Sequence, residues 1–369
     1  MAVPNRTRTR GDIVRLVHRG LDAPRLARAL SRVLERAVPF DGMCLLTFDP
    51  ATMLPTGEVI ENGLHAETLV RLAEIEQREP DFNKFTALAR GGTPAASLSD
   101  ATGGELERSL RQRELRGPQG FADELRVVCS DATGTSGALT LLREANRPLF
   151  TTSEVSFIAS IADPLADGLR RAEILRDGGT DDGGETGILV LAPDNTIELA
   201  NRPAERWLDL LSAKDMSGAE LPVAVLAVAT RARRIGSDHA TDTGAHATTG
   251  ESAWARVRAA DGRWVVVRGS LVGEPRTGQV AVMLEQARPS ELAPLIADAY
   301  GFTARERRVT ELAARGFTTN DIAARLHISA YTVQDHLKSI FEKTGTGSRG
   351  DLVARLFFDH YAPRLSSAP

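Results

Sequence analysis

The sequence predicts a multidomain α+β protein, in which two segments that mix helices with strands precede an all-α domain. Three observations support this fold class. The length of 369 residues suggests two or three domains. Apolar strand-like runs alternate with amphipathic stretches up to residue 287, and the last fifth of the chain shows only helical periodicity. A Gly- and Asp-rich stretch at 177–187 separates the two mixed segments.

The first mixed segment covers residues 11–176 and begins with an amphipathic helix. Leu26, Leu30 and Leu34 share one face of a helix predicted over 22–38. Its further expected elements are a buried strand at 42–48 that ends at Asp49, a helix at 64–77, strands at 121–130 and 136–142, and one long closing helix capped by Thr152 that runs to residue 175.

The stretch 177–187 has no apolar period, so we expect a flexible linker. It lacks the Gly-Lys-Ser/Thr ending of a phosphate-binding loop, and its carboxylates would repel phosphate. The second mixed segment, 188–287, follows it. Its expected elements are a hairpin over 187–201, a helix at 203–211, an irregular loop at 241–251, and strands at 254–258, 263–268 and 280–284.

Three helix start signals follow one another closely in the domain at 295–361. Thr303 with Glu306 forms a capping box, and Thr318 with Asp321 repeats its spacing. Ser329 is a third N-cap. Gly316 is expected to end the first helix in the left-handed conformation. Apolar residues at helical spacing predict a shared core, made of Val309, Leu312, Ala313, Ile322, Leu326, Val333, Leu337, Ile340 and Phe341, with Ile328 in the turn between the second and third helices.

The third of these helices has an outward polar face. Gln334 and Lys338 stand one turn apart, and Tyr331, Thr332 and Asp335 flank them. Gln can bond adenine, Lys can donate to guanine, and Asp can accept from cytosine in the major groove. Local charge agrees, because residues 302–350 hold 8 Lys and Arg against 5 Asp and Glu, a net +3, while the whole chain is −4.

This segment resembles the LuxR-type helix-turn-helix domain. The matching elements are Thr303–Glu306, Gly316, Asp321–Ala323, Ile328–Ser329, Thr332–Val333, His336, Ile340, Lys343–Gly345 and Ser348–Arg349. The resemblance implies base contacts by Gln334, Asp335 and Lys338. It implies phosphate contacts by Thr319, Thr332, Lys343 and Arg349. Tyr331 is expected at the DNA surface because it flanks Gln334 on the polar face.

The resemblance also implies a fourth helix at 351–358 that forms the dimer contact on DNA. Its apolar stripe consists of Leu352, Val353, Leu356 and Phe357. Two departures from the family pattern matter. Thr346 stands where the family has an apolar Val, which predicts a loosely packed junction before the last helix. Asp335 is unusual on a surface that faces an anion.

The two mixed segments resemble sensor domains. The first, with its order of helix, strand, mixed middle, hairpin and long helix, resembles a GAF domain. That resemblance implies a small-molecule or redox sensor with a pocket beside its sheet, or a purely structural dimerisation module. The second resembles a PAS domain, with Ala200-Asn201…Ala204 at the passage from strand to helix. No ligand-binding residue follows from either resemblance.

Several functional classes conflict with the sequence. Cys44 and Cys129 lie in apolar runs, which indicates buried side chains rather than a disulfide or metal pair. No apolar run approaches the roughly 18 residues of a membrane helix, and no signal core follows the basic start, so we expect a cytoplasmic protein. Asp49 ends a strand but lacks the acidic pair of a phosphorylated receiver. No metal or nucleophile motif predicts an enzyme or a cofactor.

The sequence therefore predicts a transcription regulator that binds a double-stranded DNA operator as a homodimer and works with RNA polymerase. Small-molecule or redox sensing by the N-terminal part, together with dimerisation and not phosphorylation, is expected to control it, with an effector of unknown identity. Two alternatives remain open. One is a sigma-factor-like promoter-binding protein, which would need a helical promoter-melting region upstream. The other is a sensory enzyme with a catalytic pocket in its first domain.

Overall fold

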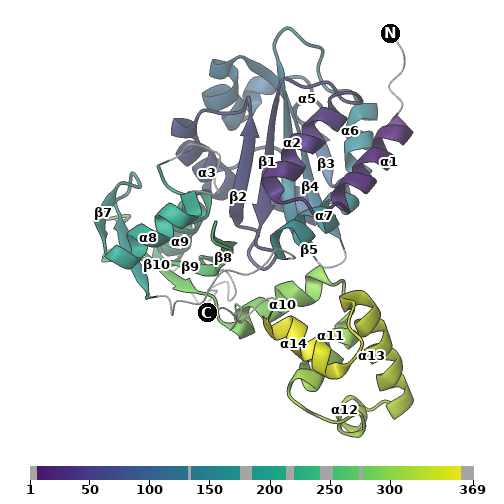
Figure 1. The fold of residues 1–369 in the computed structure, drawn as a ribbon. Helices are drawn as coiled ribbons and strands as arrows, with labels where there is room; N and C mark the ends of the chain where they lie inside the picture. The colour runs from purple at the N-terminus through teal and green to yellow at the C-terminus, as the bar shows by residue number, and fades with distance from the viewer. Residues whose placement is uncertain are drawn as a thin grey trace, which may run out of the picture. The chain divides into compact units, whose positions relative to one another are not determined.

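A computed structural model describes residues 6–131, 134–174, 185–212, 220–241, 252–273 and 277–358 (Figure 1). These residues form two compact units. The first holds residues up to 173 together with 184–260 and 264–286, and the second includes 287–358. Two five-stranded antiparallel sheets lie in the first unit, and the second is helical. The predicted α+β class with a helical C-terminal domain is confirmed. No helix within these ranges is both long and apolar enough to cross a membrane.

The first sheet belongs to residues 6–174, here called the first sheet module. Its strand order is β2-β1-β5-β4-β3, and every neighbouring pair is antiparallel. The strands are β1 (Gly42–Phe48), β2 (Pro55–Glu61), β3 (Ala95–Ser97), β4 (Phe121–Asp131) and β5 (Gly134–Glu144). Leu45 packs into a core on one face of the sheet, whereas Leu46 and Phe48 pack on the other. Both faces are covered, which explains the nearly unbroken apolar run of β1.

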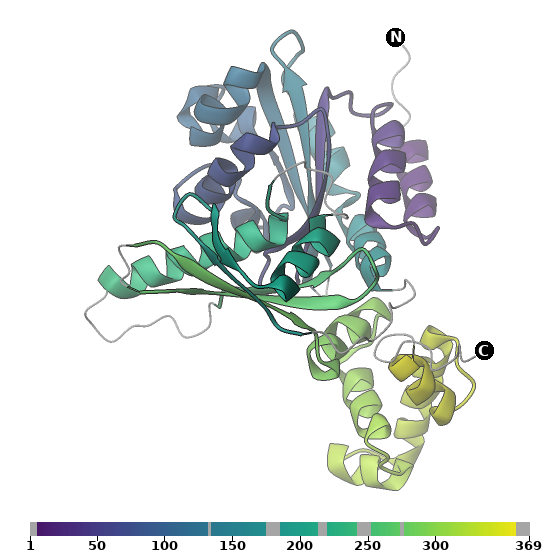
Figure 2. The ribbon, with the colours of Figure 1, turned by 60° about the vertical axis from the view of Figure 1, so that its left-hand side comes forward.

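Helices cover both faces of this sheet (Figures 1 and 2). One face packs against α1 (Arg6–Val17), α2 (Ala23–Leu34), α6 (Thr152–Ala159) and α7 (Ala162–Ile174). The other elements are α3 (Leu69–Arg78), α4 (Phe85–Arg90) and α5 (Leu98–Ala101), with short 3-10 or π turns at Ala66–Thr68, Leu106–Arg108, Gln112–Arg116 and Gly117–Gln119. Strands β1, β4 and β5 and helix α2 lie close to their predicted positions. Helix α1 and strands β2 and β3 were not predicted.

The closing helix differs from its prediction, because it is two helices with a break at residues 160 and 161. Pro164 has no N–H to bond the carbonyl of Ser160, and its ring would clash with that carbonyl, so a continuous helix is disfavoured here. The cap is also one residue earlier than predicted. Thr151, rather than Thr152, accepts from the Glu154 N–H, while Glu154 reaches back to the Thr151 N–H at 2.8 Å.

The second sheet module comprises the described residues of 185–286. Its strands have the order β7-β6-β10-β9-β8, again all antiparallel. They are β6 (Gly187–Leu191), β7 (Ile197–Ala200), β8 (Trp254–Arg258), β9 (Trp264–Leu271) and β10 (Val280–Gln286), and the helices are α8 (Arg202–Ser212) and α9 (Val223–Thr241). The expected loop at 241–251 and most of the expected linker at 177–187 lie outside the described residues.

Helix α9 was not predicted from the sequence. Its first turns read Val-Ala-Val-Leu-Ala-Val-Ala, a β-branched apolar run that local preference would place in a strand. The run is helical because it is buried almost all round. Val225, Val228 and Ala229 pack into the core of the second module, and Leu226 and Ala227 are also buried. Tertiary burial therefore overrides local propensity here.

One buried ion pair joins the two sheet modules. Asp49, at the end of β1, is fully buried, and it accepts from both the backbone N–H and the side chain of Arg256 on β8. The guanidinium Nε and Nη2 donate to the two carboxylate oxygens at 2.8 and 2.7 Å. Leu54 follows in the next loop and packs into the core of the second module. The two modules therefore share buried polar and apolar contacts.

We predict that Asp49→Asn destabilises the first unit by about 3–5 kcal/mol, because it leaves the Arg256 guanidinium buried without an anionic partner. Urea unfolding followed by tryptophan fluorescence measures this, since all three tryptophans lie in this unit. Glu67→Gln is the matched control, with a side chain 83% exposed and an expected change within about 0.5 kcal/mol. Equal unfolding midpoints for both variants would contradict the prediction.

Candidate nucleic-acid interface

The helical second unit, residues 287–358, is here called the head. Its helices are α10 (Pro289–Ala299), α11 (Ala304–Ala314), α12 (Thr319–Leu326), α13 (Ala330–Thr344) and α14 (Arg349–Phe358). Helix α10 is additional to the four that were predicted. The core contains the predicted apolar residues of α11, α12 and α13 together with Phe302, which is 2% exposed. Leu326, Ile328 and Phe341 pack against this core as partly buried residues.

The predicted start signals are present. Thr303 and Glu306 bond each other's backbone N–H at 3.2 and 2.6 Å. Thr318 and Asp321 do the same at 3.2 and 3.0 Å, so Asp completes a capping box as well as Glu. Ser329 accepts from the Thr332 N–H at 3.0 Å. Helices α11, α12 and α13 therefore begin at the residues that the sequence predicted.

The turn between α12 and α13 orients α13. His327 adopts the left-handed conformation with φ of 54°, and this residue ends α12. Ile328 then packs on the core, and Ser329 starts the next helix. Two helices joined by a three-residue turn make a helix-turn-helix, in which the second helix is the one that enters the major groove of DNA.

Helix α13 has one buried and one exposed face. Val333, Leu337 and Ile340 are buried in the core of the head. Gln334, Asp335 and Lys338 are exposed, as predicted from their spacing, and Tyr331 is 73% exposed. Thr332 is half-buried, and its hydroxyl lies 2.8 Å from the Ser329 hydroxyl. Thr319 is half-buried in the first turn of α12. The exposed side of the first two turns of α13 therefore carries hydrogen-bonding groups and a ring.

Lys343 has a contact that the sequence did not predict. Its ammonium lies 2.7 Å from Glu306 and donates to the Gly301 carbonyl at 2.9 Å. Ser339 also donates to Glu306, at 2.6 Å. This carboxylate therefore connects the start of α11 with the C-terminal half of α13. The phosphate contact of Lys343 stays a prediction, and it would compete with this ion pair.

Burial would raise the pKa of Glu306, but hydrogen bonds from Lys343, Ser339 and Thr303 outweigh burial and lower the pKa to about 2. Glu306 is 4% exposed, so the carboxylate is stabilised by neighbouring donors rather than by water. The sequence predicted Glu306 only as half of a capping box. Its contacts with Ser339 and Lys343 could not be predicted, because they depend on how α11 packs on α13.

The predicted dimer stripe of α14 is only partly available at the surface of the head. Leu352 is 1% exposed and belongs to the core of the head, so its side chain does not form a dimer surface. Leu356 packs partly against the same core, and Val353 is half-buried. The side chain of Phe357 lies outside the described residues. An apolar stripe on a short helix first satisfies the domain to which it belongs, because a small domain has little other apolar surface to bury.

Hydrogen bonds fix Thr346 at the junction before α14. Thr346 shares a hydrogen bond of 2.8 Å with the hydroxyl of Thr344, and its N–H donates to Phe341 at 3.0 Å. Gly345 takes the left-handed conformation that ends α13. Thr346 is half-buried and pairs with a hydroxyl where the family pattern has an apolar residue, and its loose packing stays a prediction. Arg349, the expected phosphate ligand, is half-buried at the start of α14.

We predict that the head loses stability as pH falls from about 4.5 to about 2, the interval between the ordinary pKa of a Glu and that of Glu306. A pKa lowered by folding stabilises the fold above this interval, and protonation removes the effect. Hydrogen exchange of amides in α11 and α13 of the full chain measures it. Glu306→Gln should remove the acid-dependent part of the exchange. An unchanged pH profile in this variant would contradict the assignment.

Solved structures resemble this chain only weakly. Escherichia coli SdiA is 11% identical, with 94% of each chain covered and a TM-score of 0.32. The ligand-binding domain of VqsR from Pseudomonas aeruginosa is 14% identical over 46% of this chain and 98% of that one, with a TM-score of 0.33. A GAF domain/HD domain protein from Geobacter sulfurreducens is 20% identical over 42% of this chain and 97% of that one, with a TM-score of 0.30. Scores this low carry no argument about fold or ligand.

Sequence relatives match the head strongly. Residues 301–356 match the family described as bacterial regulatory proteins, luxR family. The spore germination protein GerE of Bacillus subtilis is 41% identical over 54 residues, which are 15% of this chain and 73% of GerE. The response regulator Rre1 of Synechocystis and the probable transcriptional regulatory protein SgaR of Hyphomicrobium methylovorum are 42% and 46% identical over 52 residues, 14% of this chain in each case.

This chain spans only 22% of the length of Rre1 and 25% of that of SgaR, so their whole-protein activities do not transfer to it. The match with GerE covers most of that relative. The family match at 301–356 spans the capped helices α11, α12 and α13 and most of α14. Through this C-terminal head, the chain belongs to the luxR family of bacterial regulatory proteins.

Proposed function

We propose that this protein is a sequence-specific transcription regulator whose helix α13 lies in the major groove of operator DNA. The observation that carries the proposal is the exposure of Gln334, Asp335 and Lys338 on one face of α13, opposite the buried face of the same helix. Gln334 would bond adenine, Lys338 would donate to guanine, and Asp335 would accept from cytosine.

Phosphate contacts would set the register of α13 on the duplex. Thr319 at the start of α12 and Thr332 at the start of α13 lie where backbone N–H groups also point outward. Arg349 would add a charged contact, and Tyr331 a ring at the edge of the groove. Such contacts position the protein without selecting a sequence.

On DNA the protein would act as a homodimer. Val353 and Leu356 of α14 keep part of their surface outside the core of the head and would form the contact between two heads. A symmetric pair of heads requires half-sites about one helical turn apart, roughly 34 Å. RNA polymerase is the partner through which bound dimers would change transcription, and DNA access places the protein in the cytoplasm.

The first unit would provide regulation by small-molecule binding, and we propose no catalytic reaction or cofactor for it. The GAF-like and PAS-like assignments are supported by element order, because each module forms a five-stranded antiparallel sheet flanked by helices. Control by phosphorylation of Asp49 is disfavoured, since that carboxylate is fully buried and paired with Arg256. Burial raises the pKa of the Cys129 thiol to about 12, which disfavours thiolate chemistry and a redox role for this residue.

The sigma-factor alternative is less compatible with this architecture. Such a protein would need helices that bind core polymerase and melt the promoter upstream of the head. The described residues before 287 instead build two antiparallel sheets with helices packed on them.

We predict that Lys338→Ala weakens specific operator binding by about 1–3 kcal/mol and relaxes preference at one base pair, because a donor to guanine is lost. Binding titrations with the operator and with single-base variants measure both effects. Arg308→Ala is the matched control. It removes one exposed positive charge from α11, 55% exposed and paired with Glu311, and should change the affinity little. Equal losses at every sequence for Lys338→Ala would mean that Lys338 contacts only phosphate.

We predict that Val353→Asp weakens binding to an operator with two half-sites and leaves binding to a single half-site unchanged, because the charge disrupts only the contact between heads. Linking two weak sites raises affinity by roughly 10²–10⁴, so much of this gain should disappear. A parallel loss on the single half-site would place Val353 in folding or direct DNA contact and would refute the dimer assignment.

A further inference from the structure

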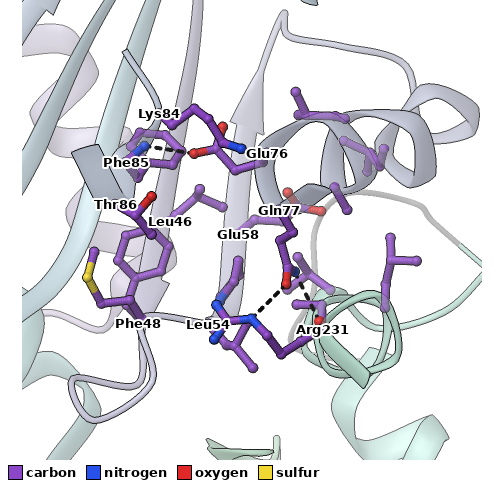
Figure 3. Close-up of a pocket in the computed structure, with 18 of the residues that line it drawn as sticks. Leu46, Phe48, Leu54, Glu58, Glu76, Gln77, Lys84, Phe85, Thr86 and Arg231 are labelled. Atoms are coloured by element: carbon purple, nitrogen blue, oxygen red, sulfur yellow. Dashed lines mark hydrogen bonds between the residues drawn. The ribbon is translucent and has the colours of Figure 1, made fainter. Parts of the chain in front are cut away.

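The first unit contains a pocket of about 240 Å³ that both sheet modules line (Figure 3). Strands β1 and β2 supply Leu46, Phe48 and Glu58, and α3 and α4 supply Gln77 and Phe85. The opposite wall comes from α9 of the second module. The volume lies just below the roughly 300–1,000 Å³ of pockets for drug-sized ligands, which indicates a smaller molecule.

The body of this pocket is apolar. Phe48 and Phe85 make an edge-to-face pair with ring centroids 5.8 Å apart, and Leu46 lies beside them. Leu226 of α9, which is 4% exposed, contributes from the second module. Figure 3 shows the rings on one side of the pocket and Gln77 with Arg231 on the other. An apolar group would therefore lie against the rings, with a polar group toward α9.

Positive charge dominates the polar part of the lining. Five cationic side chains, Lys84, Arg90, Arg126, Arg231 and Arg234, face two carboxylates, Glu58 and Glu76, which leaves a net charge of +3. Two of these cations are held by neighbours on the first module. Arg126 donates to Glu76 at 2.8 Å and lies 4.3 Å above the Phe85 ring, and Lys84 donates to the Glu79 carbonyl at 2.8 Å. The α9 cations, Arg231 and Arg234, lie on the opposite wall.

One side chain connects the two walls. The Gln77 amide of α3 donates to the Ala227 carbonyl at 3.0 Å and accepts from Arg231 Nε at 3.0 Å. Both partners belong to α9. The position of Arg231 at the pocket therefore depends on the contact between α3 and α9, and a ligand on Arg231 would act on the same contact.

We propose that this pocket binds a small organic anion, a carboxylate with an apolar body, and that the bound anion holds α9 of the second module against α3 of the first. The apolar body would lie on Phe48 and Phe85, and the carboxylate would accept from Arg231 and Arg234. The inference rests on the proposed function, in which small-molecule binding to the first unit controls the head.

Charge and burial explain why the carboxylate would lie toward α9. Lys84 belongs to the first module, and its ammonium donates to the Glu79 carbonyl at 2.8 Å. Arg126 is 2% exposed and already contacts both Glu76 and Glu124. Arg234 is half-exposed, and an arginine fork can bind a carboxylate through two parallel bonds. Such bonds are about twice as strong as neutral hydrogen bonds in the same setting.

The test uses the full chain and three probes with the same eight-carbon body: octanoate, octan-1-ol and octylammonium. Titration calorimetry at neutral pH should show octanoate binding at least about ten-fold more tightly than octanol, and octylammonium more weakly than both. No binding of octanoate, or equal affinity for octanoate and octanol, would overturn the assignment of an anionic ligand.

Variants locate the site. Arg231→Ala combined with Arg234→Ala should reduce octanoate affinity at least about ten-fold and leave octanol affinity unchanged. Arg231→Lys retains the charge and should lose less. Arg206→Ala on α8, 67% exposed, is the matched control and should bind octanoate as the parent does. Equal octanoate affinity in the double variant and the control would place the anion elsewhere and overturn the proposal.

The coupling has its own measurement. Octanoate should slow hydrogen exchange in both α3 (69–78) and α9 (223–241), because it bridges them. Slowing confined to α3 would overturn the shared site. Operator binding by the same proteins without octanoate separates the two hypotheses. Intact DNA binding without octanoate binding would refute only this inference, whereas octanoate binding without any DNA binding would refute the proposed function.

Discussion

The first unit depends on the buried ion pair between Asp49 and Arg256. Both side chains are at most 5% exposed, so each charge loses most of its hydration and must be compensated by the other. Two side-chain bonds and one backbone bond meet this need with good geometry. The pair holds the end of β1 against β8, although 207 residues separate the partners. Together with Leu54 and the Gln77 bonds to α9, the pair holds the two modules that line the pocket.

The head also contains a nearly buried charge that is compensated by partners from another helix. Glu306 is a nearly buried carboxylate at the start of α11, and its donors Ser339 and Lys343 come from α13. An unpaired carboxylate here would be costly, so the three groups hold α13 in one orientation on α11. The exposed face with Gln334 and Lys338 is thereby directed away from the core. Readout of DNA would require such a fixed orientation, because base contacts tolerate little displacement.

In the proposed mechanism the positive charge of each unit suits a different anion, DNA for the head and a small carboxylate for the first unit. The segment 302–350 carries a net charge of +3, which suits a polyanion, and its exposed side chains form hydrogen bonds in water. The pocket of the first unit also has excess positive charge, but there it lies beside apolar walls. A small carboxylate with an apolar body satisfies both features. Its binding would change the contact between α3 and α9 rather than any covalent bond, so regulation would be a shift between populated states.

Local sequence determined much of this protein. The capping boxes at Thr303 and Thr318, the N-cap at Ser329 and the strands at 42–48 and 121–131 follow from interactions between residues close in the chain, so their patterns predicted them. Only tertiary structure decided the rest. The run at 223–229 has strand-like residues but becomes helical through burial, and Leu352 enters the core instead of a dimer surface. Gln77, Arg126 and Arg231 meet at one pocket because packing depends on distant partners, which local periodicity does not specify.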